Sequence, residues 1–121
     1  DHAPHSKEEK SKGLKGSAMG VVGLETAFGV LNTKLVKTGV ISLEKLIDMM
    51  SIRPREIFDI PGGKIEVGAP ADLALLDIDK KWCVDPEKFV TMGRATPFQN
   101  WKLQGENLLT IYKGEIVYEA I

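Results

Sequence analysis

The spacing of apolar residues changes from a helical period to a strand period near residue 60. Before that point apolar residues recur every three or four positions, and after it they alternate or form short runs rich in β-branched and aromatic side chains. A chain of 121 residues has room for one domain, or for pieces of two. The sequence therefore predicts an α/β chain in which a helical unit is followed by a stranded one.

Three helices are expected between residues 23 and 60. The first should run from Gly23 to about Val36, with Gly39 stopping it. Its apolar face would contain Leu24, Ala27, Phe28, Leu31 and Leu35. Its polar, solvent-facing side would contain Glu25, Thr26, Asn32 and Lys34.

The second and third helices have their own start signals. Ser42 is a good N-cap for a helix whose apolar stripe comprises Leu43, Leu46, Ile47 and Met50. Met49 and Met50 are expected in the core. Pro54 suits the first turn of a short third helix that ends near Phe58 and buries Ile57 and Phe58.

Strand signals follow Pro61-Gly62-Gly63. Four segments are rich in strand formers or alternate in polarity, namely 64–67, 73–76, 82–84 and 108–112. Lys113-Gly114 separates the last of these from 115–118 and predicts a tight hairpin turn, because glycine readily adopts the positive φ that such turns need.

Charge and cysteine content exclude several classes of partner. Sixteen basic and seventeen acidic side chains leave a net charge of -1, so nucleic acid and anionic membrane surfaces are not expected partners. No apolar run is long enough to span a membrane and no signal segment opens the chain, so a cytoplasmic protein is expected. Cys83 is the only cysteine, and a buried inert thiol is favoured over a nucleophile.

The first five residues, Asp1-His2-Ala3-Pro4-His5, place both histidines beside a carboxylate. Pro4 favours an extended path, which could end a strand and aim side chains into a cleft, although composition alone favours a frayed terminus. Ser6 should cap a short helix over 7–10 in a loop that is either a solvated surface or part of an active-site lid. Gly20 is the candidate for close approach of the main chain to a ligand.

These residues carry a resemblance that covers nearly the whole chain. Asp1-His2-Ala3-Pro4-His5 and the segment 19–26, Met-Gly-Val-Val-Gly-Leu-Glu-Thr, resemble the last third of the dihydroorotases, which are members of the amidohydrolase superfamily. The segments 51–58, 66–73 and 93–98 resemble the same family in order and spacing. The block Gly68-Ala69-Pro70-Ala71-Asp72-Leu73 is shared by many amidohydrolases and indicates the superfamily only.

The resemblance implies a fold and a cofactor. Residues 1–58 would be the C-terminal portion of a (β/α)8 TIM-like barrel, containing the end of its last strand and its helices. Residues 59–121 would be the C-terminal part of a small β-sandwich domain. One or two zinc ions would be bound mainly by residues outside this chain, in the missing N-terminal part of the same protein. The chain alone is therefore expected to be inactive.

The resemblance also implies roles for individual residues. Asp1 would shuttle a proton at the amide nitrogen and contact the metal, and His5 would hold the carboxylate of the substrate. The main chain at Met19 and Gly20 would also contact the substrate. The family more commonly has phenylalanine at the position of Met19, so a role for an aromatic face there is in doubt. His2 would point away from Asp1 and is interpreted as structural.

The implied activity is the zinc-dependent interconversion of N-carbamoyl-L-aspartate and L-dihydroorotate in pyrimidine synthesis, by a homo-oligomer acting on a small molecule. Hydantoinase-type and allantoinase-type relatives tend to have Phe or Cys at the position of His5, so His5 favours dihydroorotase over them. Three alternatives remain open. They are another cyclic amidohydrolase of the hydantoinase or allantoinase type, a non-catalytic scaffold chain that partners aspartate transcarbamoylase, and a free-standing binding domain.

Overall fold

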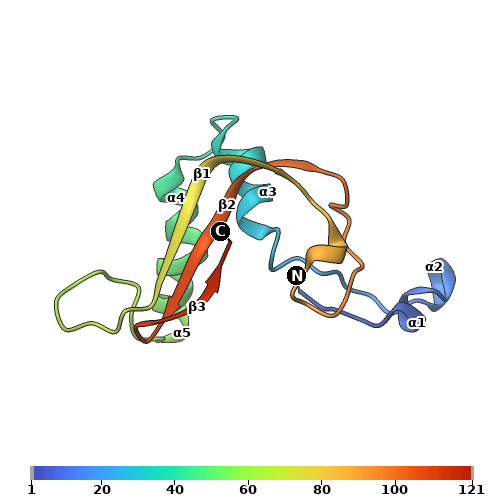
Figure 1. Cartoon of the computed structure of the whole chain (residues 1–121), viewed down its shortest axis with the longest axis horizontal. Coiled ribbons are helices and arrows are strands. Elements are labelled where there is room, and N and C mark those ends of the chain that lie inside the picture. Colours follow the sequence, from blue (N-terminus) through green and yellow to red (C-terminus); the bar gives the residue numbers. More distant parts are fainter. Residues whose placement is uncertain (1, 121) are drawn as a thin grey trace.

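The computed structural model describes residues 2–120, and Figure 1 shows the order of the elements. Two short helices, α1 (Lys7–Lys10) and α2 (Gly13–Gly16), precede α3 (Ala27–Leu31) and the π-helical turn η1 (Asn32–Val36). A second helical run comprises α4 (Leu43–Ile47), the π-helical turn η2 (Asp48–Ile52) and α5 (Arg53–Phe58). The strands are β1 (Leu73–Cys83), β2 (Lys102–Tyr112) and β3 (Glu115–Glu119), with the 3-10 turn η3 (Pro86–Lys88) between β1 and β2.

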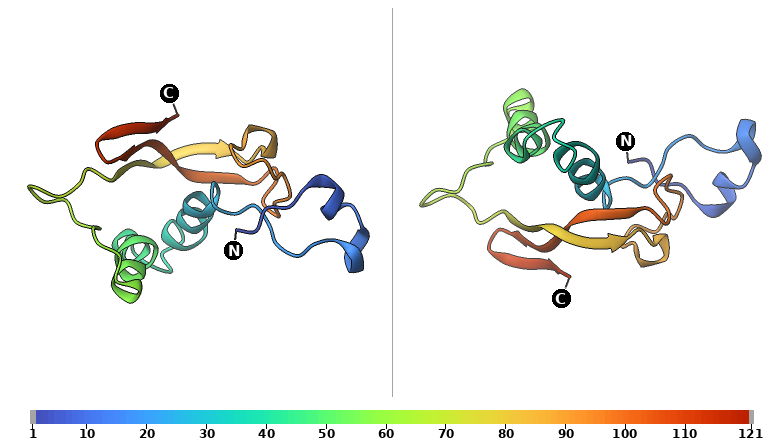
Figure 2. Two further views of the ribbon diagram at one scale, coloured as in Figure 1. Left: turned by 90° about the horizontal axis from the view of Figure 1, so that it is seen from below. Right: turned by 90° about the horizontal axis from the view of Figure 1, so that it is seen from above.

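The three strands form one antiparallel sheet in the order β1-β2-β3. The helices α3, α4 and α5 lie on one side of this sheet, as the two views of Figure 2 show. Lys113 and Gly114 connect β2 to β3 with φ values of 50° and 86°, which confirms the predicted hairpin turn. Strand formation in 73–76, 82–83 and 108–112 is also confirmed, because these residues lie in β1 and β2.

The buried core lies where α3 meets the sheet and the loop after β1. Its buried members are Val22, Val84, Phe89 and Leu103, with Val30, Trp82 and Phe98 packed around them. Gly29 of α3 sits so close to β2 that a Cβ there would lie 3.0 Å from the carbonyl oxygen of Gly105. A larger residue at position 29 would therefore push the helix off the strand.

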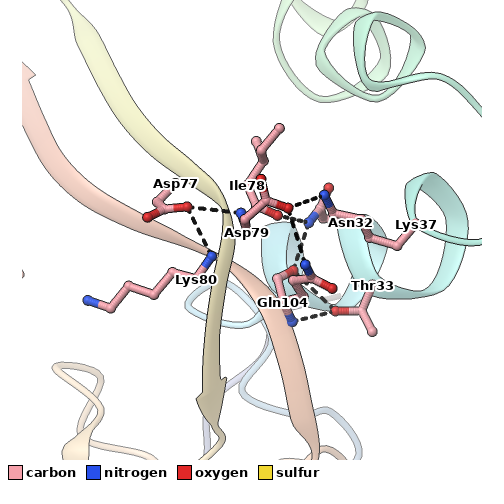
Figure 3. Close-up of polar contacts among 8 residues, drawn as sticks. All are labelled: Asn32, Thr33, Lys37, Asp77, Ile78, Asp79, Lys80 and Gln104. Carbon is pink, nitrogen blue, oxygen red and sulfur yellow. Dashed lines mark hydrogen bonds and ion pairs between the residues drawn. The ribbon is translucent and has the colours of Figure 1, made fainter.

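The polar face predicted for the first helix turns out to be partly the buried one. Thr26 and Asn32 have no exposed surface, whereas Leu24 is 70% exposed. The amide nitrogen of Asn32 donates to the carbonyl oxygens of Ile78 (3.0 Å) and Gln104 (2.8 Å). These two carbonyls lie where the pairing of β1 with β2 is irregular, and Asn32 gives them a hydrogen-bond donor. Figure 3 shows Asn32 reaching both strands at this point. Burial of an amide is favourable here because the strands offer it carbonyl partners.

The same region of β1 is bent by a register shift between Asp77 and Lys81. The carboxylate of Asp77 accepts hydrogen bonds from the N–H groups of Asp79 and Lys80, each at 2.9 Å, which closes the bend. Asp79 then pairs with Lys37 at 2.6 Å, and that ammonium is the main reason why the pKa of Asp79 is lowered (Figure 3). The end of η1 is thereby joined to the bend in β1.

The second and third predicted helices are confirmed as α4 and α5, which the π-helical turn η2 joins into one continuous helical run over residues 43–58. Ser42 caps it as expected, its hydroxyl accepting from the N–H of Lys45 at 3.1 Å. Pro54 lies in the first turn of α5, as predicted, directly after the π-helical turn η2. A π-turn widens the helix and leaves room for a residue that lacks an N–H.

Several residues expected in the core are exposed. Met49, Met50, Ile57 and Phe58 are all exposed, Phe58 by 72%, because no element of residues 2–120 covers that side of the helix. Cys83 is also exposed, so its expected burial was wrong: β1 is open to solvent at that residue. Residues 64–67 form no strand and lie in a long loop that projects from the sheet (Figure 1). No helix within residues 2–120 has the length and apolar character of a membrane span.

Candidate functional site

The segment that begins with His2 runs beside residues 20–24. The N–H of Ala3 donates to the carbonyl oxygen of Val21 at 2.9 Å. The Nδ1 atom of His2 accepts from the N–H groups of Gly23 (3.4 Å) and Leu24 (3.2 Å). Because one ring nitrogen of His2 is engaged with main chain at the start of the α3 region, the geometry agrees with a structural role for this histidine.

A loop from the stranded half supports this segment. The N–H of Val22 donates to the carbonyl oxygen of Ala95 at 2.8 Å. Gly93 packs so tightly that a Cβ there would lie 2.9 Å from the Cβ of Pro4 and 3.1 Å from a methyl group of Val22. The block 93–98, which resembles the family in sequence, therefore packs against Pro4 and Val22.

Glu25 fixes the same loop and was missed as a site residue. Its carboxylate accepts from the N–H of Val90 (2.9 Å), the N–H of Thr91 (3.0 Å) and the hydroxyl of Thr91 (2.6 Å). Burial opposes ionisation of Glu25, but the bonds from Thr91 and Val90, with nearby Arg94, together lower its pKa. A helical pattern places Glu25 on the polar face and gives no sign of these partners.

His5 lies at the start of the loop that contains α1. Its side chain is 29% exposed, and its Nδ1 atom is 3.7 Å from a carboxylate oxygen of Glu9. Ser6 and Glu9 form a capping box, as the predicted N-cap at Ser6 requires. The hydrogen bonds from the main chain and side chain of Ser6 lower the pKa of Glu9, with a smaller contribution from His5. A carboxylate therefore stands beside the imidazole.

Met19 and Gly20 lie on the other side of that loop. The side chain of Met19 is 90% exposed, so residues 2–120 leave its position open to a contact from outside. Gly20 has a φ of 114°, and a Cβ there would lie 2.5 Å from the Cβ of Ala3. Only glycine fits this position, because its main chain packs against Ala3. Close approach of Gly20 to a ligand stays a prediction.

The predicted site residues are thus brought together only in part. Gly20 touches Ala3, two residues before His5, but no hydrogen bond among residues 2–120 joins His5 to Met19 or Gly20. Asp1, the expected catalytic and metal-contacting residue, lies outside the described residues. Residues 2–120 contain no group of three or more His, Cys, Asp or Glu side chains that could hold a metal ion. The residues that the structure describes therefore contain no complete metal site by themselves.

The sequence is similar to curated proteins named dihydroorotase. The chain is 46% identical over all of its 121 residues to a protein named dihydroorotase from Brevibacillus brevis, and 45% identical over 119 residues to one from Bacillus caldolyticus. It spans only 28% of the length of each of these curated relatives.

Solved structures with a similar fold include hydantoinases. The structure of L-hydantoinase (dihydropyrimidinase) from Arthrobacter aurescens matches with a TM-score of 0.88 and 35% identity, covering 98% of this chain and 28% of that one. That of D-hydantoinase from Bacillus sp. AR9 matches with a TM-score of 0.86 and 25% identity, covering 98% of this chain and 27% of that one. Residues 1–117 match the amidohydrolase family, and the chain therefore belongs to that family.

Proposed function

We propose that this chain is part of a dihydroorotase, which interconverts N-carbamoyl-L-aspartate and L-dihydroorotate in pyrimidine synthesis. The observation that carries the proposal is the 46% identity to a dihydroorotase across all 121 residues. Because this identity extends over every helix and strand of the chain, we expect the same class of substrate as for that relative. Because the chain spans 28% of that relative, the remaining machinery would lie in other residues of a longer protein.

The residues of this chain would bind and protonate the substrate. In the hydrolytic direction the ring C–N bond breaks and the leaving nitrogen needs a proton, which a carboxyl group such as Asp1 can deliver. His5 would hold the carboxylate of the substrate, a role that suits a partly exposed imidazole at the edge of a loop. Main-chain groups of Met19 and Gly20 would complete the contact, in keeping with the exposed position of Met19.

Zinc is the cofactor that we propose for the whole enzyme, as one or two ions. When bound, such an ion activates water and polarises a carbonyl group. The described residues do not fit a metal site by themselves, because no three suitable side chains gather within residues 2–120. Most ligands would therefore come from the rest of the protein, and Asp1 would be the contact made by this chain.

The architecture that we propose assigns residues 1–58 to the end of a (β/α)8 barrel and 59–121 to a small β domain. The exposed apolar side chains of the helix over 43–58 support this assignment, since they need a cover that residues 2–120 lack. The enzyme would be a cytoplasmic homo-oligomer. Covalently continuous sequence would supply the remaining barrel strands.

A hydantoinase-type activity on other cyclic amides is the second candidate. It is favoured by the TM-score of 0.88 to an L-hydantoinase at 35% identity. The two candidates differ in the substrate, because dihydroorotate carries a carboxylate on its ring whereas hydantoin and dihydrouracil have none. His5, as a partner for an anion, favours the substrate with a carboxylate.

The test is an assay of the full-length protein, metal-loaded, on dihydroorotate, hydantoin and dihydrouracil. We expect turnover of dihydroorotate to exceed that of the other two by at least about a hundredfold in kcat/KM, the discrimination expected when a site built for a charged group receives a ligand without it. Asp1→Asn should lower kcat by about a hundredfold or more, because the proton carrier is lost. Turnover of hydantoin alone would support the second candidate, and no turnover of any substrate would favour a non-catalytic scaffold that partners aspartate transcarbamoylase.

A further inference from the structure

The ammonium group of Lys10 ties together the two sides of the N-terminal loop, which we define as residues 4–20. Its Nζ atom donates to the carbonyl oxygens of Ala18 (2.8 Å) and Gly20 (2.9 Å), and both bonds are partly buried. The hydroxyl of Ser17 donates to the carbonyl oxygen of Lys10 at 2.9 Å, which joins the same two sides again. The end of α1 is thus attached directly to residues 17–20.

This tie matters because the rest of the molecule gives the loop little support. α1 and α2 project away from the sheet and from the other helices in all three views (Figure 1 and Figure 2). Neither helix contains a buried residue. With no apolar core of its own, the loop depends on polar contacts for its shape, and Lys10 makes two that bridge across it.

The bonds of Lys10 fix the direction of specific peptide groups. A trans peptide is planar, so its C=O and its N–H point in opposite directions. Holding the carbonyl oxygen of Ala18 therefore directs the N–H of Met19 away from the ammonium group. In the same way, holding the carbonyl oxygen of Gly20 directs the N–H of Val21 away from the ammonium group. Among residues 2–120, neither the N–H of Met19 nor that of Val21 donates a hydrogen bond, so both can meet an acceptor from outside.

The position of these peptide groups relative to His5 is also set. Gly20 packs on Ala3, and the N–H of Ala3 donates to the carbonyl oxygen of Val21 at 2.9 Å. These contacts hold together the two ends of the loop, at Ala3 and at residues 20–21, two residues before His5. We call this junction the neck of the loop. Lys10 orients the peptides on one side of that neck, and His5 stands on the other.

We propose that Lys10 is a positioning residue for the carboxylate of the substrate. It orients the peptide groups at 18–19 and 20–21 so that main-chain N–H groups meet an anion together with His5. The inference rests on the proposed function, because it takes the ligand to be an acidic cyclic amide. Two of the three N–H bonds of the Lys10 ammonium group already donate to carbonyl oxygens of the loop. Lys10 therefore supports the main chain that contacts the substrate and does not contact the substrate itself.

The test compares Lys10→Met, Lys10→Arg and Lys15→Met in the full-length, metal-loaded protein. Lys15 is an exposed lysine of the same loop and serves as the matched control. We expect Lys10→Met to raise KM for dihydroorotate about tenfold while kcat changes by less than about threefold, since binding of substrate and transition state would be lost together. Lys10→Arg should restore KM to within about threefold, because a guanidinium can donate to both carbonyls.

A second measurement separates positioning from direct contact. The N–H of Ala18 donates to the carbonyl oxygen of Glu9 at 3.1 Å, so its exchange reports whether the two sides of the loop stay together. Hydrogen exchange of the substrate-free protein should accelerate about tenfold or more at this amide in Lys10→Met, and should be unchanged in Lys15→Met. Unchanged exchange, or an unchanged KM in an active enzyme, would overturn the proposal. Absence of dihydroorotate turnover by the unaltered protein would instead count against the proposed function, while the exchange experiment would still decide whether Lys10 holds these peptides.

Discussion

Glu25 and Thr91 are joined by two hydrogen bonds across 66 positions of the sequence. The carboxylate of Glu25 accepts from both the N–H group and the hydroxyl group of Thr91, at 3.0 Å and 2.6 Å. This contact attaches the start of the α3 region to the loop over 90–96, which in turn supports Val22 and Pro4. The stranded half thereby positions the segment that contains His5.

Glu25→Gln should destabilise the protein at neutral pH. The amide group cannot accept from all three donors, so one N–H of the loop loses its partner. Because Glu25 is partly open to water, we expect a decrease of roughly 1 kcal/mol in the free energy of unfolding. Urea unfolding of the full-length protein measures it, with the exposed Glu66→Gln as the control variant. An equal effect of both substitutions would contradict the contact.

The contribution of Glu25 should also depend on pH. Its pKa in the folded protein is lowered from the ordinary value of 4.5, so the carboxylate form is favoured by folding. The stabilisation is fully present above that ordinary value and is lost as the pH falls through the lowered pKa. The difference in unfolding free energy between the unaltered protein and Glu25→Gln should therefore be constant from about pH 7 to pH 5 and shrink below it. A difference that grows on acidification would refute this assignment.

Gly20→Ala should distort the neck of the N-terminal loop. A methyl group there would lie 2.5 Å from the Cβ and 2.8 Å from the carbonyl oxygen of Ala3, and the φ of 114° is unfavourable for alanine. Gly39→Ala is the matched control, because Gly39 also has a positive φ but a Cβ there meets nothing within 4 Å.

We expect the control to cost about 1 kcal/mol of stability from backbone conformation alone. Gly20→Ala should cost about 3 kcal/mol because the steric overlap is added, and it should raise KM for dihydroorotate. Thermal unfolding and kinetics of the full-length protein measure both effects. If the two variants are equally stable and active, the close packing of Gly20 on Ala3 is wrong.

Asn32→Asp should be among the most damaging single changes in this chain. Asn32 has no exposed surface, and its amide nitrogen donates to two carbonyl oxygens. A carboxylate would face those oxygens as a buried, unpaired charge, which costs about 3 kcal/mol or more. Protonation restores one donor, so the loss of stability should be smaller at acid pH. Asn100→Asp, at an exposed position, should change the unfolding midpoint little.

Local signals were sufficient for much of the fold. Ser6 and Ser42 cap helices because a serine hydroxyl reaches the N–H three residues later, and Lys113-Gly114 turns because the pair accepts positive φ. Residues 64–67 alternate like a strand yet form none, because a strand needs a partner and none pairs with them within residues 2–120.

Tertiary contacts account for what the pattern missed. Asn32 is buried because two strands 46 and 72 residues away need a donor, and no periodicity reports that need. Glu25 and Lys10 look like solvated charges in the sequence, and only the fold shows the backbone groups that they hold. Ile57 and Phe58 were predicted to be buried and are exposed, because no other element within residues 2–120 covers them.

The isolated 121 residues should self-associate and show no dihydroorotase turnover. Large apolar side chains such as Met49, Ile57 and Phe58 are exposed on one helical run, and such surfaces associate in water. The metal ligands needed for turnover are also absent from residues 2–120. Size-exclusion chromatography at several concentrations and a standard assay measure both. A compact, active monomer would show that the chain needs no further sequence.

His5→Phe should separate substrates by their charge. If His5 holds the carboxylate of the substrate, replacing it removes the anion partner while leaving the aromatic bulk, so KM for dihydroorotate should rise about tenfold or more. Turnover of dihydrouracil should stay within about threefold, because this substrate has no carboxylate for His5 to contact.

His2→Phe is a poor control, since His2 accepts two main-chain hydrogen bonds. Glu8→Gln, on the exposed side of α1, is a better one and should change neither constant. Equal losses on both substrates in His5→Phe would mean that the imidazole supports the loop, through Glu9 and the capping box at Ser6, and does not bind the substrate.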